Sequence, residues 1–150
     1  KMNINYFMNK AIDQANKALL YDELPVGVVI INNKNNEIIT LSHNMINTNK
    51  NATNHAEIIA INETCKKLGK KYLSDTSIFV TLEPCIMCTA AISEAHIDRV
   101  YFGAYDDKKI GMESIIKTLK NNSFFIPEIY GGINESECSN LIKNFFKKKR

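Results

Sequence analysis

Residues that bind zinc occur in two short motifs of this sequence, each with a spacing that brings side chains together. His55 stands two residues before Glu57, and Cys85 and Cys88 lie three residues apart, directly after Pro84. Zinc prefers imidazole and thiolate ligands in a tetrahedral arrangement, and catalytic zinc sites have three protein ligands and leave the fourth position to water. The pattern therefore predicts a catalytic Zn2+ site held by His55, Cys85 and Cys88.

Glu57 has the position of a proton shuttle rather than of a further ligand. Zinc lowers the pKa of a bound water from roughly 15.7 to about 7, which makes hydroxide available near neutral pH. An amino group leaves poorly without a proton, and a carboxylate beside the metal can take the proton of the water and deliver it to the ring nitrogen and the departing ammonia. The order His-x-Glu followed by Pro-Cys-x-x-Cys is typical of zinc base deaminases, so the sequence has the parts that a hydrolytic deamination requires.

Taken alone, Cys85 and Cys88 could equally form a redox pair or half of a structural zinc site. His55 and Glu57 favour catalytic zinc, because a structural site needs no proton shuttle. The competing class of protein is a zinc-stabilised binding module or an inactive partner subunit. The remaining cysteines and histidines have no motif, and we expect them to be core, loop or packing residues: Cys65, Cys138, His43 and His96.

The periodicity of the apolar residues predicts alternating helices and strands around these motifs. Helices are expected over residues 4–21, 55–68, 84–94 and 114–119 and from about 135 onward. Strands are expected over residues 26–31, 37–41, 77–82, 97–102 and 125–130. The first two strands should form an antiparallel hairpin, and the strand–helix–strand unit over 78–102 should be a parallel crossover. This order indicates an α/β fold with a mixed sheet.

The composition is that of an ordinary globular domain. The 150 residues are 45% hydrophobic and 23% charged with a formal net charge of +3, which suits a single domain over residues 1–150. No apolar run is long enough to cross a bilayer, and the first residues lack the apolar segment of a signal peptide. We therefore expect no membrane association and a cytoplasmic location, where a close cysteine pair is a metal or redox site rather than a disulfide.

Beyond these motifs, the chain resembles the bacterial tRNA-specific adenosine deaminases, which belong to the cytidine and deoxycytidylate deaminase superfamily, over nearly its whole length. The resemblance is carried by these stretches: 24–27, 54–60, 81–88, 99–106 and 145–146. It implies a three-layer cytidine-deaminase-like α/β fold, with a mixed five-stranded sheet and helices on both faces. It also implies a homodimer that hydrolyses adenosine to inosine at the wobble position of a tRNA, with the anticodon stem-loop as partner and no DNA.

The resemblance assigns roles to further residues. Asn44 corresponds to an asparagine that contacts the target nucleotide, and Asp106 to an aspartate near its sugar. Val26 and Val28 are expected to wall the base pocket. The chain departs from the family pattern at Tyr105 in place of the usual Arg, at residues 108–111 in place of Lys-Thr-Gly, and at His43 in place of Trp, and its hairpin turn is slightly longer than usual.

Phe145 and Phe146 match aromatic residues of a C-terminal helix that lies against the RNA, and they precede the basic residues 147–150. Aromatic rings can stack on unpaired bases, and lysines can neutralise phosphates. Both rings could equally be core positions of an amphipathic helix whose basic end complements the helix dipole. From the residues alone the two interpretations stay equally open.

The alternative function is that of a zinc-dependent deaminase of a free base or nucleoside, cytosine or guanine, in nucleotide salvage. Such an enzyme needs the same metal site, so the ligands do not decide between the two. His55 stands where small cytidine deaminases have Cys, and the basic C-terminal residues favour a polymer.

Overall fold

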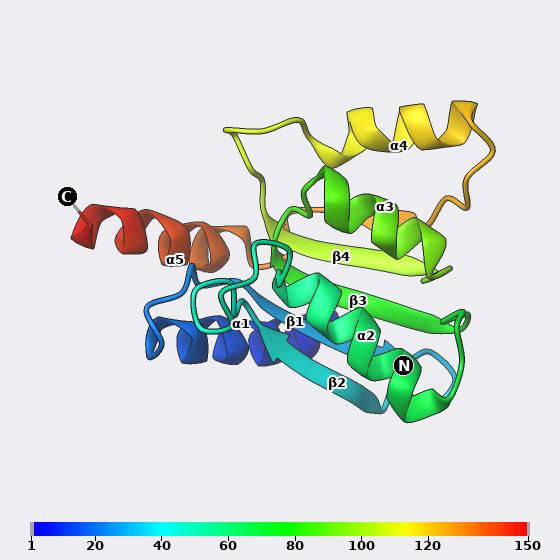
Figure 1. Cartoon of the computed structure of the whole chain (residues 1–150), viewed down its shortest axis with the longest axis horizontal. Coiled ribbons are helices and arrows are strands. Elements are labelled where there is room, and N and C mark those ends of the chain that lie inside the picture. The colour runs from blue at the N-terminus through cyan, green and yellow to red at the C-terminus, as the bar shows by residue number, and fades with distance from the viewer. Residues whose placement is uncertain (1, 150) are drawn as a thin grey trace.

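The structure, a computed structural model, describes residues 2–149 and contains these elements in chain order: α1 (Ile4–Leu19), β1 (Gly27–Asn32), β2 (Ile38–His43), α2 (Ala56–Leu68), β3 (Thr76–Leu82), α3 (Ile86–Glu94), β4 (Arg99–Ala104), α4 (Met112–Asn121), β5 (Glu128–Tyr130) and α5 (Glu135–Lys148). The strands form one five-stranded sheet in the order β2-β1-β3-β4-β5 (Figure 1). β1 is antiparallel to β2 and β3, whereas β3, β4 and β5 are parallel. The predicted hairpin, the parallel β3–β4 pair and the mixed sheet are confirmed. Within residues 2–149 no helix is both long and apolar enough to span a membrane.

Helices cover both faces of the sheet, as predicted. α2 and α3 pack on one face with α4 beside α3, and α1 and α5 pack on the other (Figure 1). Successive side chains of a strand point to opposite faces, and β1 follows this rule. Val28 and Ile30 belong to the core beneath α2 and α3, whereas Val29 and Ile31 belong to the core beneath α1.

Two glycines let α1 and α5 approach the sheet closely. A Cβ at Gly27 would lie 1.9 Å from the carbonyl oxygen of Ala11 on α1, and a Cβ at Gly103 would lie 2.3 Å from Sγ of Cys138 on α5. The Cys138 side chain is fully buried in that contact. The close contact between α5 and the sheet bears on the site. α5 extends past the end of the strands near which the predicted metal ligands lie (Figure 1).

The last strand is shorter than the sequence predicts. β5 begins at Glu128 rather than at Phe125. The carbonyl oxygen of Phe125 accepts a hydrogen bond from Oγ of Ser93 at 2.6 Å, and its ring stacks on His96 with 4.8 Å between the ring centroids. Residues 125–127 therefore pack against the end of α3 instead of extending the sheet.

The histidines and cysteines without a motif are packing residues, as predicted. His96 is stacked between Tyr72 and Phe125, and His43 stacks on Tyr21 with 5.7 Å between the ring centroids. Cys138 is buried, and Cys65 is half-buried against the core beneath α2.

Candidate active site

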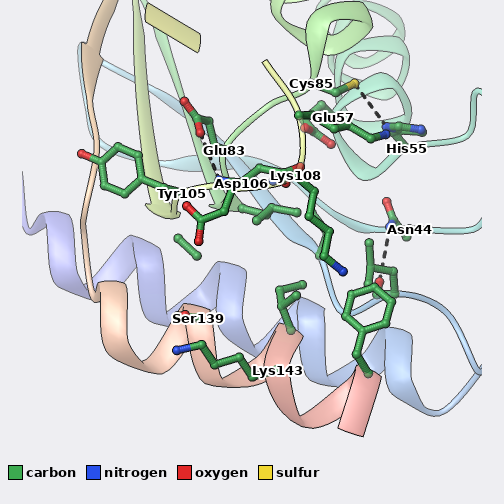
Figure 2. A pocket seen from close by; sticks show the side chains of 18 of the residues that line it. Asn44, His55, Glu57, Glu83, Cys85, Tyr105, Asp106, Lys108, Ser139 and Lys143 are labelled. Carbon is green, nitrogen blue, oxygen red and sulfur yellow. Dashed lines mark hydrogen bonds between the residues drawn. The ribbon is translucent and has the colours of Figure 1, made fainter. Parts of the chain in front are cut away.

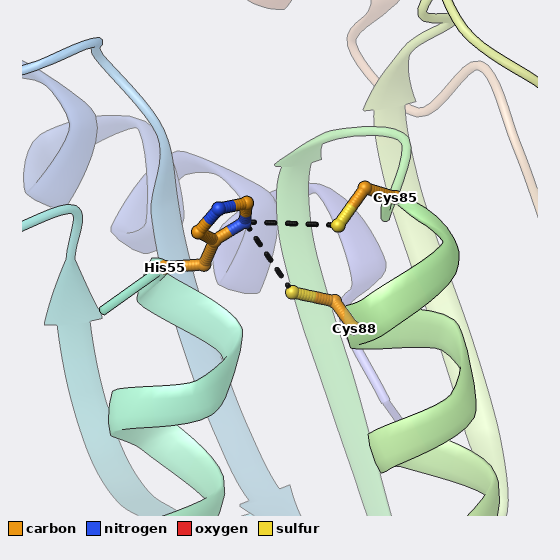
Figure 3. Close-up of side chains that lie close together, drawn as sticks. All are labelled: His55, Cys85 and Cys88. Carbon is orange, nitrogen blue, oxygen red and sulfur yellow. Dashed lines mark hydrogen bonds between the residues drawn. The ribbon is translucent and has the colours of Figure 1, made fainter. Parts of the chain in front are cut away.

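His55 and Cys85 occupy the same structural position, the residue immediately before a helix. His55 is the N-cap of α2 and Cys85 the N-cap of α3, both have extended backbones, and neither side chain caps its own helix. Both side chains therefore point into the gap between the two helix starts, where Cys88 joins them from the first turn of α3 (Figure 3). Pro84 precedes the N-cap of α3 rather than opening the helix, which corrects the predicted helix start.

The three predicted ligands converge on one point. Nδ1 of His55 lies 3.7 Å from Sγ of Cys85 and 3.6 Å from Sγ of Cys88, and the three ligand atoms all lie within 4.8 Å of one another. Ligands of one tetrahedral zinc, at about 2.1 Å for nitrogen and about 2.3 Å for sulfur, are roughly 3.6 Å apart. The group therefore fits zinc with three protein ligands.

The electrostatics of the two thiols also suit a cation. The hydrogen bond from Cys88 lowers the pKa of Cys85 to about 3, against the opposing effect of burial and with a further contribution from His55. The same hydrogen bond, together with burial, raises the pKa of Cys88. The N-terminus of α3 favours the negative charge that both sulfurs would carry as ligands of a metal ion.

Glu57 lies beside the ligands but faces the open side of the site. It stands in the first turn of α2 and is only 4% exposed. Burial raises the pKa of its carboxyl group to about 7. A carboxyl group with such a pKa can both hold and release a proton near neutral pH, which is what general acid–base catalysis requires.

A cavity of about 710 Å³ opens beside His55, Glu57 and Cys85 (Figure 2). Much of its lining is apolar: Leu24, Val26, Ile46, Leu82, Ala104 and Ile142. An apolar cavity with a few convergent polar groups is the usual form of a small-molecule or cofactor site. The polar groups at one end of this cavity are those of His55, Glu57 and Cys85, so the cavity can hold a ring next to a hydrolytic centre.

Comparison with protein families agrees with this geometry. Residues 1–104 match the family model of the cytidine and deoxycytidylate deaminase zinc-binding region. The chain belongs to this deaminase family. The match includes both motifs, and the predicted zinc site is in keeping with it.

Individual members of the family are similar to most of the chain. This deaminase is 45% identical to the tRNA-specific adenosine deaminase of Rickettsia bellii (strain RML369-C), over 95% of the chain and 99% of the relative. A solved structure from biochemical and structural studies of A-to-I editing by tRNA:A34 deaminases at the wobble position matches with a TM-score of 0.84 and 37% identity, over 91% of this chain and 98% of that one. The guanine deaminase of Bacillus subtilis matches with a TM-score of 0.66 and 29% identity, over 83% and 72%. The predicted family and fold are confirmed.

The deaminase fold brings several of the predicted substrate residues into the same cavity as the metal ligands: Val26, Asn44, Asp106 and Phe146. Val28 does not line the cavity, because it is fully buried in the core beneath α2. Phe145 is half-buried on α5, outside the cavity lining, and packs edge-on against Phe146 with 5.5 Å between the centroids. Phe146 is 39% exposed, which excludes the alternative that it is a core residue. Arg150, the last of the basic residues, lies outside the described part of the chain.

Asn44 holds the start of α2 as well as lining the cavity. Its Oδ1 accepts a hydrogen bond from the backbone N–H of Ala56 at 2.9 Å, and its Nδ2 donates to the carbonyl oxygen of Leu24 at 3.3 Å. The first N–H groups of a helix have no partner within the helix. Asn44 therefore supplies one for the helix that carries His55 and Glu57.

Three charged residues of the cavity are not predicted from the sequence: Glu83, Lys108 and Lys109. The basic residues of the C-terminal helix, Lys143 and Lys147 among them, are expected from the sequence to meet phosphates, and both line the cavity. Lys108 and Lys109 come from the segment between β4 and α4, and Lys143 and Lys147 come from α5. The signal for the two loop lysines is the pair itself at 108–109, which departs from the family pattern and adds two positive charges close to Asp106. A glutamate at the end of a buried strand was a second signal, because a charge in that position needs partners.

Tyr105, at the position of the usual Arg, does not take over a role at the metal. Its side chain points away from the ligands (Figure 2), and its ring packs edge-on against Phe102 with 5.0 Å between the centroids. Residue 105 therefore adds no positive charge to the cavity. The basic groups on the walls formed by α5 and by the segment after β4 are the four lysines.

Proposed function

We propose that this deaminase converts adenosine to inosine at the wobble position of a tRNA anticodon. The observation that carries the proposal is the combination, in one cavity, of the His55, Cys85 and Cys88 group, the buried carboxyl of Glu57 and the four lysines. The first two provide a deamination centre. The lysines can neutralise the phosphates of a polyanion, whereas a neutral free base has no negative charge for them to bind.

Zinc held by the three ligands supplies a water of lowered pKa for attack on the base. Glu57 takes a proton from the attacking water as the new C–O bond forms at C6 of adenine, and it delivers a proton to the adjacent ring nitrogen. It then takes the proton of the new hydroxyl group on C6 and transfers it to the amino group, so that the C–N bond breaks, the C6–O bond becomes a carbonyl and ammonia leaves. The net reaction consumes one water and yields inosine and ammonia, and the carboxylate of Glu57 is restored.

The apolar lining of the cavity excludes water around the base, with Val26 as one wall and Val28 packed behind it in the core. Asn44 already uses one lone pair and one N–H within the protein, and its remaining groups are available to the target nucleotide. We assign Asp106 to the hydroxyl groups of the sugar. A base in an anticodon loop is partly unstacked, so moving it into the cavity costs less than the few kcal/mol required in a duplex.

We assign the flanking nucleotides to the two walls that carry lysines. Phe146 offers an exposed ring at the mouth of the cavity, and Phe145 supports that ring from the same helix. Aromatic stacking and phosphate neutralisation together are typical of single-stranded RNA recognition. Since tRNA is the substrate in this proposal, we place the protein in the cytoplasm.

We also propose that the deaminase acts as a homodimer. α3 begins beside the metal ligands with Ile86, whose side chain is 61% exposed. A second copy packed on this side of the molecule would cover that apolar residue. Sedimentation of the purified protein should give twice the mass of one chain, and a monomer at micromolar concentration would contradict this part of the proposal.

The deciding experiment uses zinc-loaded protein and an anticodon stem-loop with A at the wobble position. The matched controls are the same stem-loop with G or C there, and free adenosine, guanine and cytosine. Inosine formed only in the A-containing stem-loop supports the proposal. Turnover of a free base instead would favour the second candidate, a salvage deaminase, for which the similarity to the Bacillus subtilis guanine deaminase is the supporting observation.

A further inference from the structure

The segment between β4 and α4, residues 105–111, forms one wall of the active-site cavity. Asp106, Asp107, Lys108 and Lys109 all line the cavity. The Lys108 side chain extends to the opposite wall, where Nζ lies 4.4 Å from the centroid of the Phe146 ring on α5. The position of this 105–111 loop therefore sets the width of the cavity mouth and the place of the proposed sugar-binding residue (Figure 2).

A single buried carboxylate holds the two ends of the loop. Glu83 is 7% exposed, and its Oε1 accepts a hydrogen bond from the backbone N–H of Asp106 at 3.0 Å. Its Oε2 accepts a hydrogen bond from the backbone N–H of Met112 at 2.7 Å. The backbone of Glu83 is itself fixed, because its N–H donates to the carbonyl oxygen of Ala104 at 2.8 Å.

The loop has little else to hold its backbone. Apart from the N–H of Asp106, the loop N–H group that has a hydrogen-bond partner within the described residues 2–149 is that of Lys108. It donates to Oδ1 of Asp106, inside the loop itself. α4 begins after Gly111, which has no side chain to cap the helix. The Glu83 carboxylate, from the residue that follows β3, supplies this cap at the end of the helix that favours negative charge.

From this arrangement we infer that Glu83 is a positioning residue for the substrate. It acts through Asp106 and Lys108 by fixing the 105–111 loop, and it takes no part in zinc binding or in proton transfer. The inference rests on the proposed function in one respect, since the substrate in the kinetic test is an RNA stem-loop.

The test compares zinc-loaded wild type with Glu83→Gln, which keeps the size of the side chain but leaves only one oxygen for two N–H donors. We expect the KM for the stem-loop to rise about tenfold and kcat to change by less than about twofold, because uniform substrate binding is lost while the chemistry stays intact. Zinc content should remain one ion per chain. Hydrogen exchange at residues 106–112 should become faster in the absence of RNA.

Glu113→Gln is the matched control. Glu113 is exposed in the first turn of α4, so this change removes the same charge near the same helix end and leaves the loop bonds intact. It should leave KM and loop exchange unchanged. Glu83→Asp, which keeps the charge but cannot reach both donors, should raise KM as Glu83→Gln does.

Three results would overturn the inference: loss of zinc or of kcat with an unchanged KM in Glu83→Gln, unchanged loop exchange, or an equal effect of Glu113→Gln. If wild type fails to deaminate the stem-loop, the proposed function fails. The exchange measurement, which needs no RNA, then decides by itself whether Glu83 fixes the loop.

Discussion

At the scale of single residues, the role of Glu57 rests on its burial beside the ligands. Replacing it with Gln keeps the shape of the side chain and removes its ability to carry a proton. We expect Glu57→Gln to retain zinc and to lose activity by at least roughly 10³-fold, the range of general acid–base catalysis. Single-turnover inosine formation, measured together with zinc content, checks this. Glu63→Gln, an exposed change on the same helix, should have full activity. Activity of Glu57→Gln within tenfold of wild type would remove the assigned role.

The group of His55, Cys85 and Cys88 could be predicted from side-chain chemistry, although His55 and Cys85 lie 30 residues apart. Each motif is short and lies at a helix start, and imidazole and thiolate side chains share a preference for zinc. Glu83 could not be predicted in the same way. Its partners are backbone N–H groups at residues 106 and 112, more than twenty positions away, and backbone groups leave no mark in a sequence. Val28 differs from its prediction in another way. It is expected to wall the base pocket, but the alternation of side chains along β1 directs it into the core rather than toward the cavity.

At the scale of elements, the segment from β2 to α2 depends on another buried carboxylate. Glu23, only 1% exposed, accepts hydrogen bonds from the N–H of Asn47 at 3.2 Å and from the N–H and Oγ of Thr48, both at 2.7 Å. Burial raises the pKa of Glu23, but the hydrogen bonds from Thr48 and Asn47 outweigh it, so the pKa lies below its ordinary value. The ionised carboxylate thus holds the loop that carries Asn44.

This arrangement has a definite pH dependence. A lowered folded-state pKa adds stability above the unfolded-state pKa, and that contribution is lost as pH falls through the folded-state value. Glu23→Gln should therefore reduce the free energy of unfolding by about 1–3 kcal/mol at pH 7. The difference from wild type should shrink as the pH is lowered below 4. Urea unfolding over a pH series measures both, with exposed Glu37→Gln as the control. A pH-independent difference would show that the charge of Glu23 is not involved.

The elements themselves could be predicted from periodicity, but their rotation and ends could not. α2 buries Ala56, Glu57, Ala60, Ile61 and Thr64. The sequence offers Ile58 and Leu68 as apolar positions, yet Ile58 is half-buried and Leu68 is exposed. In this orientation His55 faces the cysteines of α3 and Glu57 lines the cavity. Tertiary requirements of the site outweigh the local apolar pattern.

At the scale of the whole molecule, zinc held by His55, Cys85 and Cys88 would join the starts of α2 and α3, which pack on the same face of the sheet. A ligand that binds only the folded state adds stability by mass action, about 2.7 kcal/mol at 100 times its Kd. Removal of zinc should therefore lower Tm by roughly 5–10 °C for a chain of this size. Differential scanning calorimetry with and without chelator measures this. Cys85→Ser should abolish the zinc-dependent shift, and Cys65→Ser, which changes a half-buried thiol outside the site, should preserve it. Equal shifts in both variants would place the metal elsewhere.

The formal net charge of +3 is too small to attract RNA to the molecule as a whole, so affinity must come from where the lysines lie. Lys143 and Lys147 on α5 line the same cavity as Lys108 and Lys109. Each lysine that neutralises a phosphate of a single strand adds roughly 0.7 to the slope of log Kd against log salt. Lys143→Gln and Lys147→Gln should each weaken stem-loop binding and reduce that slope by about this amount, and the double variant by twice as much. Lys120→Gln, at the far end of α4, should leave the slope unchanged. Slopes that are equal in wild type and in all four variants would mean that the RNA does not pass along α5, and the path of the flanking nucleotides would then have to follow another face.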